Sequence, residues 1–559
     1  MIRNNLFRTK LCFLLWAAAL SPALLGQEAV DCASCHDQVK KLENTPHARL
    51  TCAGCHSEIV AYPHPKKTVK PACADCHDNI ARDEARGVHG LARAKGNEAA
   101  PDCAVCHGDI HEIQRPNSIA FRTAAPDTCG MCHSEIAARF KESVHGKALA
   151  AKNTAAPICT DCHGEHSIIA PGRSESPVSA GRIRETCGRC HGDLRLSRRF
   201  GLPADRVLSF DASFHGLAGK AGSQSVANCA SCHGYHDILP SSDPKSTVNA
   251  KSLPSTCGKC HPGAGQRFAI GPVHFLAGGK EPVGVRWVRE IYLLMIPMVI
   301  GLMALHNFGD WIRKVLQLRF RSRVPGLMFR SASTADNPVV AEFRMFPFER
   351  IQHALLLTSF SVLVWTGFAL KYPDQWWARP LVMWESAFPL RATVHRVAAV
   401  VMMAAAVMHA VSLIVNRKLR EHWYAMLPNV SDVRESLQNM TWLFGLRSTK
   451  PTLSSHGYIE KAEYWAVAWG TAIMAITGVA LWAVNFSLRW LPKAWLDIAT
   501  AVHFYEAVLA TLAIVVWHLY SVIFDPDVYP LDTAWLTGYS PRKRPRHGPH
   551  APSGDSTKT

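Results

Sequence analysis

The pattern of hydrophobic and polar positions divides the chain at about residue 285. Residues 30–280 are polar and rich in Gly, Pro and Ala, and they show no long apolar period that could form a conventional core. Five apolar segments follow, each near the ~20 residues that a helix needs to cross a bilayer. They lie at about 288–308, 351–370, 392–415, 464–484 and 500–523. The pattern predicts a mostly α protein, in which an extended domain with little regular structure precedes an all-α transmembrane bundle of five helices.

The N-terminus has the pattern of an export signal. Arg3, Arg8 and Lys10 precede an apolar stretch, Leu11–Leu25, and small residues follow it. This order is typical of a secretory signal, which is either cleaved or kept as an anchor. The predicted divisions are residues 1–29 (signal peptide or anchor), 30–280 (exported domain), 285–311 (first transmembrane helix), 312–349 (loop), 350–525 (four-helix domain) and 526–559 (basic tail).

Loop charge predicts how the bundle is oriented. Residues 311–350 carry eight Lys and Arg, 416–462 carry seven and the tail after 524 carries five, against three in 371–391 and two in 485–499. Because basic loops stay in the cytoplasm, the C-terminus is predicted to be cytoplasmic and residues 30–280 periplasmic, on a bacterial inner membrane. The formal charge of +17 is not taken to indicate nucleic acid, since much of it is arginine in loops beside the membrane spans.

Cysteine usage points to covalent haem. Eighteen of the nineteen cysteines form Cys-x-x-Cys-His motifs, and the other is Cys12 in the N-terminal apolar run. In this motif two sulfurs on one turn attach to the porphyrin and the adjacent histidine binds the iron. The cysteines are Cys32, Cys35, Cys52, Cys55, Cys73, Cys76, Cys103, Cys106, Cys129, Cys132, Cys159, Cys162, Cys187, Cys190, Cys229, Cys232, Cys257 and Cys260. The proximal ligands are then His36, His56, His77, His107, His133, His163, His191, His233 and His261. Nine c-type haems are predicted.

The same region holds as many further histidines as motifs. They are His47, His64, His89, His111, His145, His166, His215, His236 and His274. As a set they predict a second axial ligand for every haem, although any one could be a surface residue. An iron with histidine on both faces has no open position, so it transfers electrons and does little else. His111, His166 and His236 follow a proximal ligand too closely to serve that iron, so each is expected to reach a neighbouring haem.

The motifs repeat as pairs. A Cys-Gly-x-Cys-His motif is followed by Val/Phe-His-Gly and then by Cys-x-x-Cys-His-Gly with a further histidine. Cys129 to His166 and Cys187 to His236 are full copies, Cys73 to His111 is a looser one and Cys257 to His274 a truncated one. Repetition of a haem-pair unit predicts an extended array rather than one globule.

Histidines in the apolar segments predict further haem sites, because ionisable residues in a membrane span are functional by default. His395 and His409 are 14 residues apart, and His503 and His518 are 15 apart, so each pair lies about 21 Å apart along its axis and on one face of its helix. Two helices with histidine at two depths can hold two stacked b-type haems. His395 and His503 are expected to bind the outer haem. His353, His409, His518 and His306 compete for the inner one, and two of them would be packing histidines; a third haem is the other alternative.

Residues 350–525 resemble the b-type subunit of formate dehydrogenases and nickel-iron hydrogenases. The resemblance rests on short motifs in order, namely Arg350-x-x-His353, Thr366-Gly367, His395-Arg396, Glu460-Lys461, Thr477-Gly478 and the pair His503 and His518. It implies His395–His503 for the outer haem and His353–His518 for the inner one. His409 and the preceding helix with His306 depart from the family pattern.

The whole layout resembles the Cbc-type inner-membrane cytochromes of metal-respiring bacteria. That resemblance implies a menaquinol:cytochrome c oxidoreductase of anaerobic respiration, which takes electrons from the quinone pool and passes them to periplasmic c-type cytochromes. The family's quinol site lies beside the inner haem, so the candidates here are His456, Glu460, His409 and His306. Glu460 and Lys461 could equally be interfacial anchors.

Two rival functions follow from the same residues. A terminal reductase would reduce a small oxyanion at one c-type haem, and a high-spin, ligand-binding haem would favour it. A membrane anchor and relay for a separate dehydrogenase would not oxidise quinol by itself. Quinol-dependent reduction of the c-type haems by the isolated chain would exclude the anchor and relay.

Overall fold

The computed structural model describes residues 31–60, 62–64, 66, 69–266, 273–275, 281–323, 342–447, 451, 454 and 456–540. The predicted export signal, residues 324–341 of the predicted loop and the tail after Ser540 lie outside the described residues. The chain forms two compact units, residues 1–176 and 177–559, and each is described by itself. The predicted boundary at residue 280 therefore falls inside the second unit.

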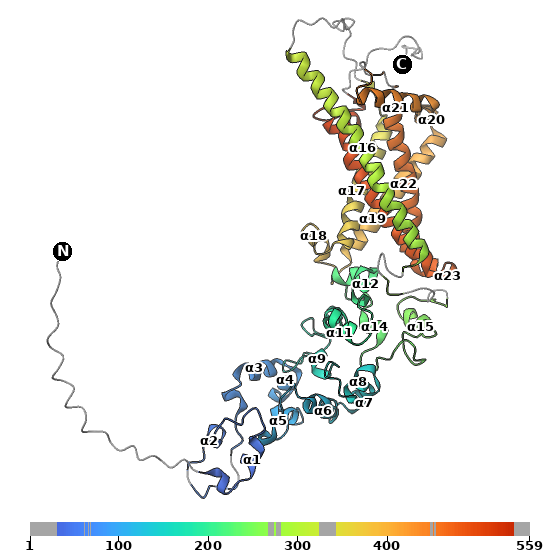
Figure 1. The fold of residues 1–559 in the computed structure, drawn as a ribbon. Coiled ribbons are helices and arrows are strands. Elements are labelled where there is room, and N and C mark those ends of the chain that lie inside the picture. The colour runs from blue at the N-terminus through green and yellow to red at the C-terminus, as the bar shows by residue number, and fades with distance from the viewer. Residues whose placement is uncertain are drawn as a thin grey trace, which may run out of the picture. The chain divides into compact units, whose positions relative to one another are not determined.

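The first unit consists of short helices joined by loops (Figure 1). They are η1 (Cys32–Ser34), α1 (Gln38–Leu42), α2 (Cys52–Cys55), η2 (Cys73–Asp75), α3 (Asp78–Arg86), α4 (Val88–Ala94), α5 (Cys103–His107), η3 (Ile110–Glu112), α6 (Ile119–Gly130), α7 (Ser134–Glu142), α8 (Val144–Ala150) and α9 (Cys159–His163). Its buried apolar cluster is small, with Ala125, Leu149, Ala156 and Ile158 at its centre. Because so little protein surface is buried, bound haem would have to supply most of the apolar interior.

The second unit begins with more helices of the same kind. They are α10 (Ile183–His191), α11 (Leu194–Arg199), α12 (Arg206–Ala212), α13 (Phe214–Lys220), α14 (Cys229–His233) and α15 (Leu253–Gly258). The long helices of the bundle follow.

Five helices among the described residues are long and apolar enough to cross a membrane, as predicted. They are α16 (Val283–Arg323), α17 (Pro347–Lys371), α19 (Leu390–Val415), α22 (Tyr458–Trp482) and α24 (Lys493–Ala513), which continues through the π-helical turns η4 (Ile514–His518) and η5 (Tyr520–Phe524). The mostly helical fold is therefore confirmed. The helix α16 continues past residue 311, the predicted end of the first transmembrane segment, and Lys314 in this continuation is buried.

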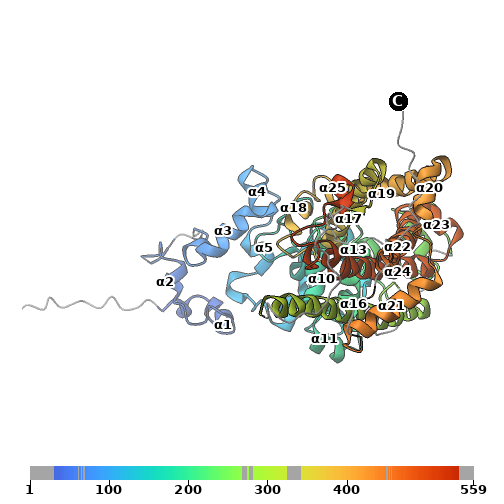
Figure 2. The same cartoon turned by 90° about the horizontal axis from the view of Figure 1, so that it is seen from above.

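Packing in the bundle pairs α17 with α19 and α22 with α24, and α16 lies along α24. Figure 2 shows α17, α19, α22 and α24 grouped together, with α16 along one side. Trp287, Leu294, Met298, Trp469 and Ile476 are more than half exposed on these helices, which suits contact with lipid rather than water.

Short elements close both ends of the bundle. They are α18 (Arg379–Val382), α20 (Arg417–Tyr424), α21 (Val430–Leu443), α23 (Val484–Trp490), α25 (Ala534–Thr537) and two strands, β1 (Glu342–Phe343) and β2 (Tyr539–Ser540). The strands pair antiparallel, with Glu342 opposite Ser540. We call the end with α23 the c side, because a Cys-x-x-Cys-His motif contacts it, and the end with β1 and β2 the tail side.

Candidate haem sites

Each Cys-x-x-Cys-His motif begins in a helical turn, which is a short helix by itself in α2, α5, α9 and α14 and the last turn of a longer helix in α6, α10 and α15. In α5 the Asp102 carboxylate caps the turn by accepting from Val105 N at 3.1 Å, and Asn228 caps α14 in the same way at 3.0 Å. Cysteines three residues apart on one turn lie on the same face, and the histidine follows directly. This is the arrangement that two thioether bonds and one axial ligand require.

Glycine turns the chain away after three of the proximal histidines. Gly108, Gly164 and Gly234 have φ of 80°, 90° and 81°, in the left-handed region that glycine adopts without strain. The next histidine, at His111, His166 and His236 respectively, is thereby directed away from the iron that precedes it. The glycine of the repeated Cys-x-x-Cys-His-Gly pattern is therefore explained by the backbone conformation that this position requires.

The repeated His-Gly pair has a packing reason. A Cβ on Gly146 or Gly216 would lie 2.1 Å from a backbone oxygen of the preceding helix, Phe140 O or Phe210 O. Each pair stands in the first turn of a helix whose cap is Ser143 or Ser213. Only glycine permits the two helix backbones to approach so closely, and this approach sets the direction of the preceding histidine.

The structure brings motif histidines together with the further histidines. Two imidazoles bound to one iron at about 2 Å each place their ring centroids about 6 Å apart. Seven pairs among the described residues have centroids between 5.7 and 6.4 Å apart. They are His36–His64, His47–His77, His56–His111, His89–His133, His107–His166, His215–His261 and His233–His274. The ring spacing fits an iron porphyrin between each pair.

The pairs join different copies of the repeat. His166 lies against His107 of the preceding copy, and His89 lies against His133 of the following one. Four histidines are outside these seven pairs, namely the motif residues His163 and His191 and the further residues His145 and His236. Outside the seven pairs there are thus two further histidines for two motifs, so the numbers of the two kinds remain equal.

Neighbouring motifs are also close through their cysteines. The thiols of Cys32 and Cys52, of Cys73 and Cys103, of Cys129 and Cys159, and of Cys187 and Cys229 lie close enough to influence each other's pKa. The sulfurs that would carry two different porphyrins are therefore adjacent, which agrees with the pairwise repeat.

Burial favours the neutral imidazole that an iron requires. It lowers the pKa of His107, His215, His233 and His274 below the usual value for histidine. The nearby second histidine of each pair lowers the pKa of His107, His215 and His274 further. These side chains are therefore deprotonated near neutral pH.

The c side of the bundle carries one histidine pair held by threonines. Nδ1 of His395 on α19 lies 2.8 Å from Thr366 Oγ1 on α17, and Nδ1 of His503 on α24 lies 2.9 Å from Thr477 Oγ1 on α22. Each threonine hydroxyl donates to a backbone carbonyl of its own helix at 2.7 Å, so its oxygen is left to accept from Nδ1–H. Both histidines are therefore held with Nε2 directed away from the threonine, as iron ligation needs.

A glycine lies beside each of these rings. A Cβ on Gly478 would meet His503 Cε1 at a tight 3.3 Å, whereas one on Gly367 would make an ordinary contact with His395 Cε1 at 3.5 Å. The two Thr-Gly pairs therefore take equivalent positions beside the two histidines, and glycine is needed for space only at Gly478.

The tail side carries a second pair, His353 on α17 and His518 in η4. Their ring centroids are 6.3 Å apart. His518 Nδ1 lies 3.1 Å from the Glu463 carboxylate on α22, a contact that fixes its orientation and strengthens it as a ligand. This spacing is like that of the seven pairs above, and His353 and His518 are the two of the four competing histidines whose rings lie against each other.

His409 and His306 are held by other side chains. His409 lies 3.1 Å from Gln352 Oε1 and 2.9 Å from Tyr464 Oη. His306 lies 3.2 Å from Asn307 Oδ1 and 2.7 Å from Tyr458 Oη. Both ring nitrogens of each are thus within hydrogen-bond distance of protein atoms, in the manner of packing histidines.

His456 and Glu460 lie on the tail side as well. The His456 ring is 5.1 Å from that of His422. Glu460 caps α22 by accepting from Gly457 N at 3.1 Å, and it lies 3.6 Å from Arg344. Glu460 therefore has a structural role at the start of its helix.

One c-type site adjoins the bundle directly. Nδ1 of His261, which pairs with His215, lies 3.0 Å from Asn485 Oδ1 on α23. Asn485 can hold this ligand as Thr477 holds His503. The last motif is therefore fixed to the c side of the membrane helices.

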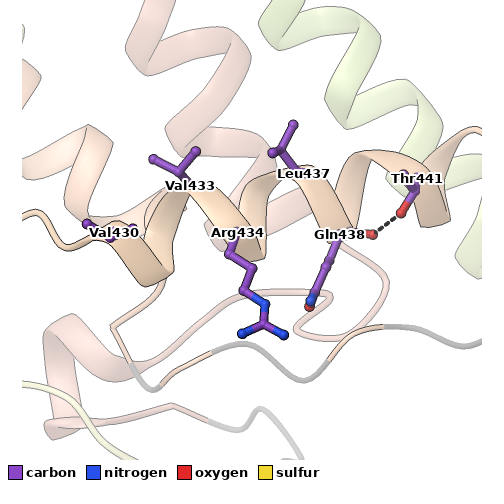
Figure 3. Close-up of a pocket in the computed structure, with 6 residues that line it drawn as sticks. All are labelled: Val430, Val433, Arg434, Leu437, Gln438 and Thr441. Atoms are coloured by element: carbon purple, nitrogen blue, oxygen red, sulfur yellow. Dashed lines mark hydrogen bonds between the residues drawn. The ribbon is translucent and has the colours of Figure 1, made fainter.

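A surface hollow on α21 lies apart from these sites. Figure 3 shows Val433 and Leu437 on one side of the helix and Arg434 and Gln438 on the other. Its lining residues are Val430, Val433, Arg434, Leu437, Gln438 and Thr441. None of them is a haem ligand, so we assign it no chemistry.

Comparisons with known proteins agree with this division. Residues 344–531 match a family model described as prokaryotic cytochrome b561. A curated relative, multiheme cytochrome MtrA of Shewanella baltica (strain OS185), is 23% identical over 197 residues, which cover 30% of this chain and 54% of the relative. The chain spans about half the length of that relative. No solved structure matches. The matches support a multihaem cytochrome with c-type and b-type parts that carries electrons in a membrane.

Proposed function

We propose that the chain is a menaquinol:cytochrome c oxidoreductase of a bacterial inner membrane. Menaquinol is oxidised beside the tail-side pair His353–His518. Electrons then pass to the c-side pair His395–His503, enter the nine c-type haems and leave to a soluble periplasmic cytochrome. In this proposal the tail side faces the cytoplasm and the motifs face the periplasm, as the loop charges predict.

The observation that carries this proposal is the order of histidine pairs through the bundle. The pair His353–His518 lies toward the tail side, on α17 and η4. His395 on α19 and His503 on α24 lie nearer the c side. The site of His261 follows at Asn485. Such an order supplies consecutive electron carriers across the hydrocarbon.

The surroundings of His353 and His518 suit a quinol. Gln352 and Tyr464, which hold His409, directly adjoin His353 and Glu463 in the chain. His306 stacks on Trp517, the neighbour of His518, with ring centroids 4.8 Å apart. Hydrogen-bonding groups within reach of a haem edge are what quinol oxidation needs, so His306 and His409 remain the candidate contacts.

The pairing of motif histidines favours conduction over chemistry at the c-type haems. An iron with two imidazole ligands offers no site for an oxyanion. The seven close ring pairs support this ligation for most of the array. A terminal reductase would need an iron with one open position.

The test is anaerobic mixing of the purified full-length protein with menadiol, a soluble menaquinol analogue. We expect the b-type absorbance to appear first and the c-type absorbance to follow, with about eleven irons per chain. A protein that dithionite reduces fully but menadiol leaves oxidised would contradict quinol oxidation and favour the anchor and relay. A ferric c-type haem that is high-spin in the untreated protein would favour the reductase.

A further inference from the structure

One face of α16 carries ionisable side chains at successive turns. His306, Asp310 and Lys314 are spaced by four residues, and each is only 7% exposed. Residues at this spacing are neighbours on a helix surface, and together they span about 12 Å of its axis. Such groups in a membrane helix are costly and are functional by default.

The lower part of this face joins a charged network that reaches the tail-side surface. Lys314 Nζ lies 2.6 Å from Asp310 Oδ2, 2.6 Å from Asp525 Oδ1 and 3.1 Å from Asp527 Oδ2. The Tyr520 hydroxyl donates to Asp310 Oδ2 at 2.8 Å. The Asp525 side chain is 8% exposed, whereas that of Asp527 is 49% exposed. The network therefore runs from the interior of the bundle to solvent.

Lys314 is surrounded by carboxylates. It faces three of them, and two are buried. The Arg313 guanidinium lies elsewhere, over the Trp442 ring at 5.5 Å. Glu435 and Glu460 are further carboxylates near this region, beside Tyr458. Carboxylates can act as acid and base for a proton in transit, so a cluster of them that reaches solvent can conduct one.

The upper part of the face ends at an amide with an unused oxygen. Asn439 of α21 is 3% exposed, and its Nδ2 donates to Tyr458 Oη at 2.9 Å. Its Oδ1 has no hydrogen-bond partner among the described residues. A buried acceptor without a donor is costly, and a ligand hydroxyl could supply the donor. Tyr458 in turn contacts His306 Nε2 at 2.7 Å.

We propose that a quinol hydroxyl donates to Asn439 Oδ1, and that its proton leaves through Tyr458 and His306 to Asp310, Lys314, Asp525 and Asp527. This rests on the proposed quinol oxidation. The quinol loses two electrons and two hydroxyl protons as its two C–O bonds become carbonyls. His353 and His518 would hold a b-type haem that accepts the two electrons one at a time and passes each to the next carrier, and the two protons would leave in turn along α16 to the tail-side solution.

The experiment follows the full-length haem-loaded protein in detergent after mixing with menadiol or with dithionite. In Asp310→Asn we expect reduction of the b-type haem by menadiol to slow by about a hundredfold, the scale of a lost acid–base group. Reduction by dithionite should be unchanged, because that reaction does not use the site. Asp310→Glu should restore most of the rate. The control Asp497→Asn alters a comparable i,i+4 pair with Lys493 on α24 and should match wild type.

An infrared difference spectrum and the KM for menadiol are two further readouts. The infrared difference between oxidised and reduced wild-type protein should contain a carboxyl band that Asp310→Asn loses. Asn439→Leu, which leaves the charged network intact, should raise the KM for menadiol by about tenfold, the scale of one lost hydrogen bond.

The outcomes separate this proposal from the one on which it rests. Failure of menadiol to reduce wild type would overturn quinol oxidation itself. If menadiol reduces wild type, and Asp310→Asn and Asn439→Leu both behave like it with the carboxyl band retained, quinol oxidation stands and the α16 path is overturned.

Discussion

At the scale of single residues, the hydrogen bonds of the membrane histidines differ. Thr366, Thr477 and Glu463 each contact one ring nitrogen of a histidine, so that Nε2 of His395, His503 and His518 is left for iron. His306 and His409 instead have both nitrogens within hydrogen-bond distance of protein atoms. Nδ1 of His353 has no such partner among the described residues. In the proposed function, these surroundings separate ligands from candidate quinol contacts.

Thr477→Val tests this interpretation. Loss of the acceptor for His503 Nδ1 should lower the affinity for the c-side b-type haem by about 10- to 100-fold, as for other outer-shell partners of metal ligands. The measurement is the content of b-type and c-type haem in the purified variant, and c-type haem should be unchanged. Thr511→Val is the matched control, because Thr511 bonds only to a carbonyl of its own helix. Full b-type content in both variants would contradict the role of Thr477.

Sequence reasoning reached these residues unevenly. The cysteines and proximal histidines follow from a motif that is contiguous in the chain, and the Thr-Gly pairs were visible as part of a resemblance. Glu463 and Asn439 were missed because their partners are 55 and 133 residues away. Asp310 and Lys314 carried a signal that was overlooked, since charges in an apolar helix point to function.

At the scale of elements, the repeat works by exchange between copies. The glycine after a motif sends the next histidine to another copy, so His111 lies against His56 and His166 against His107. The haem-pair repeat could be predicted because it is a spacing along the chain. The partner of each further histidine could not, because it depends on how the copies stack.

His111→Ala tests the exchange. The haem on Cys52 and Cys55 should stay attached, but its iron should lose the ligand opposite His56 and become high-spin. We expect one high-spin signal among nine c-type haems by electron paramagnetic resonance, together with new binding of carbon monoxide. His111→Met should remain low-spin with a raised potential, because a thioether can take the same position. A wholly low-spin His111→Ala protein would show that another residue serves His56.

The five long helices were predicted with their order and approximate positions, since apolar length is a local property of the chain. The predicted bounds of the first transmembrane segment, 285–311, stay a prediction. The helix α16 itself continues to Arg323, and its buried Lys314 contacts Asp310, Asp525 and Asp527. A hydropathy pattern contains no record of such a distant ion pair.

At the scale of the whole molecule, one contact joins the motif-bearing region to the membrane helices. The last motif, with His261, contacts Asn485 on α23, so in the proposed function the membrane haems and the covalent haems belong to one electron path. Loss of any intermediate carrier should then interrupt the flow without affecting carriers on either side of the gap.

The most direct test of this claim is stopped-flow mixing of His503→Ala protein with menadiol, beside wild type. This variant lacks a ligand of the c-side b-type haem but keeps His353, His518 and all nine motifs. We predict that the tail-side b-type haem is reduced at the wild-type rate while the c-type haems stay oxidised, although dithionite reduces them fully. Reduction of the c-type haems by menadiol at the wild-type rate, in protein shown to lack the c-side b-type haem, would contradict the account.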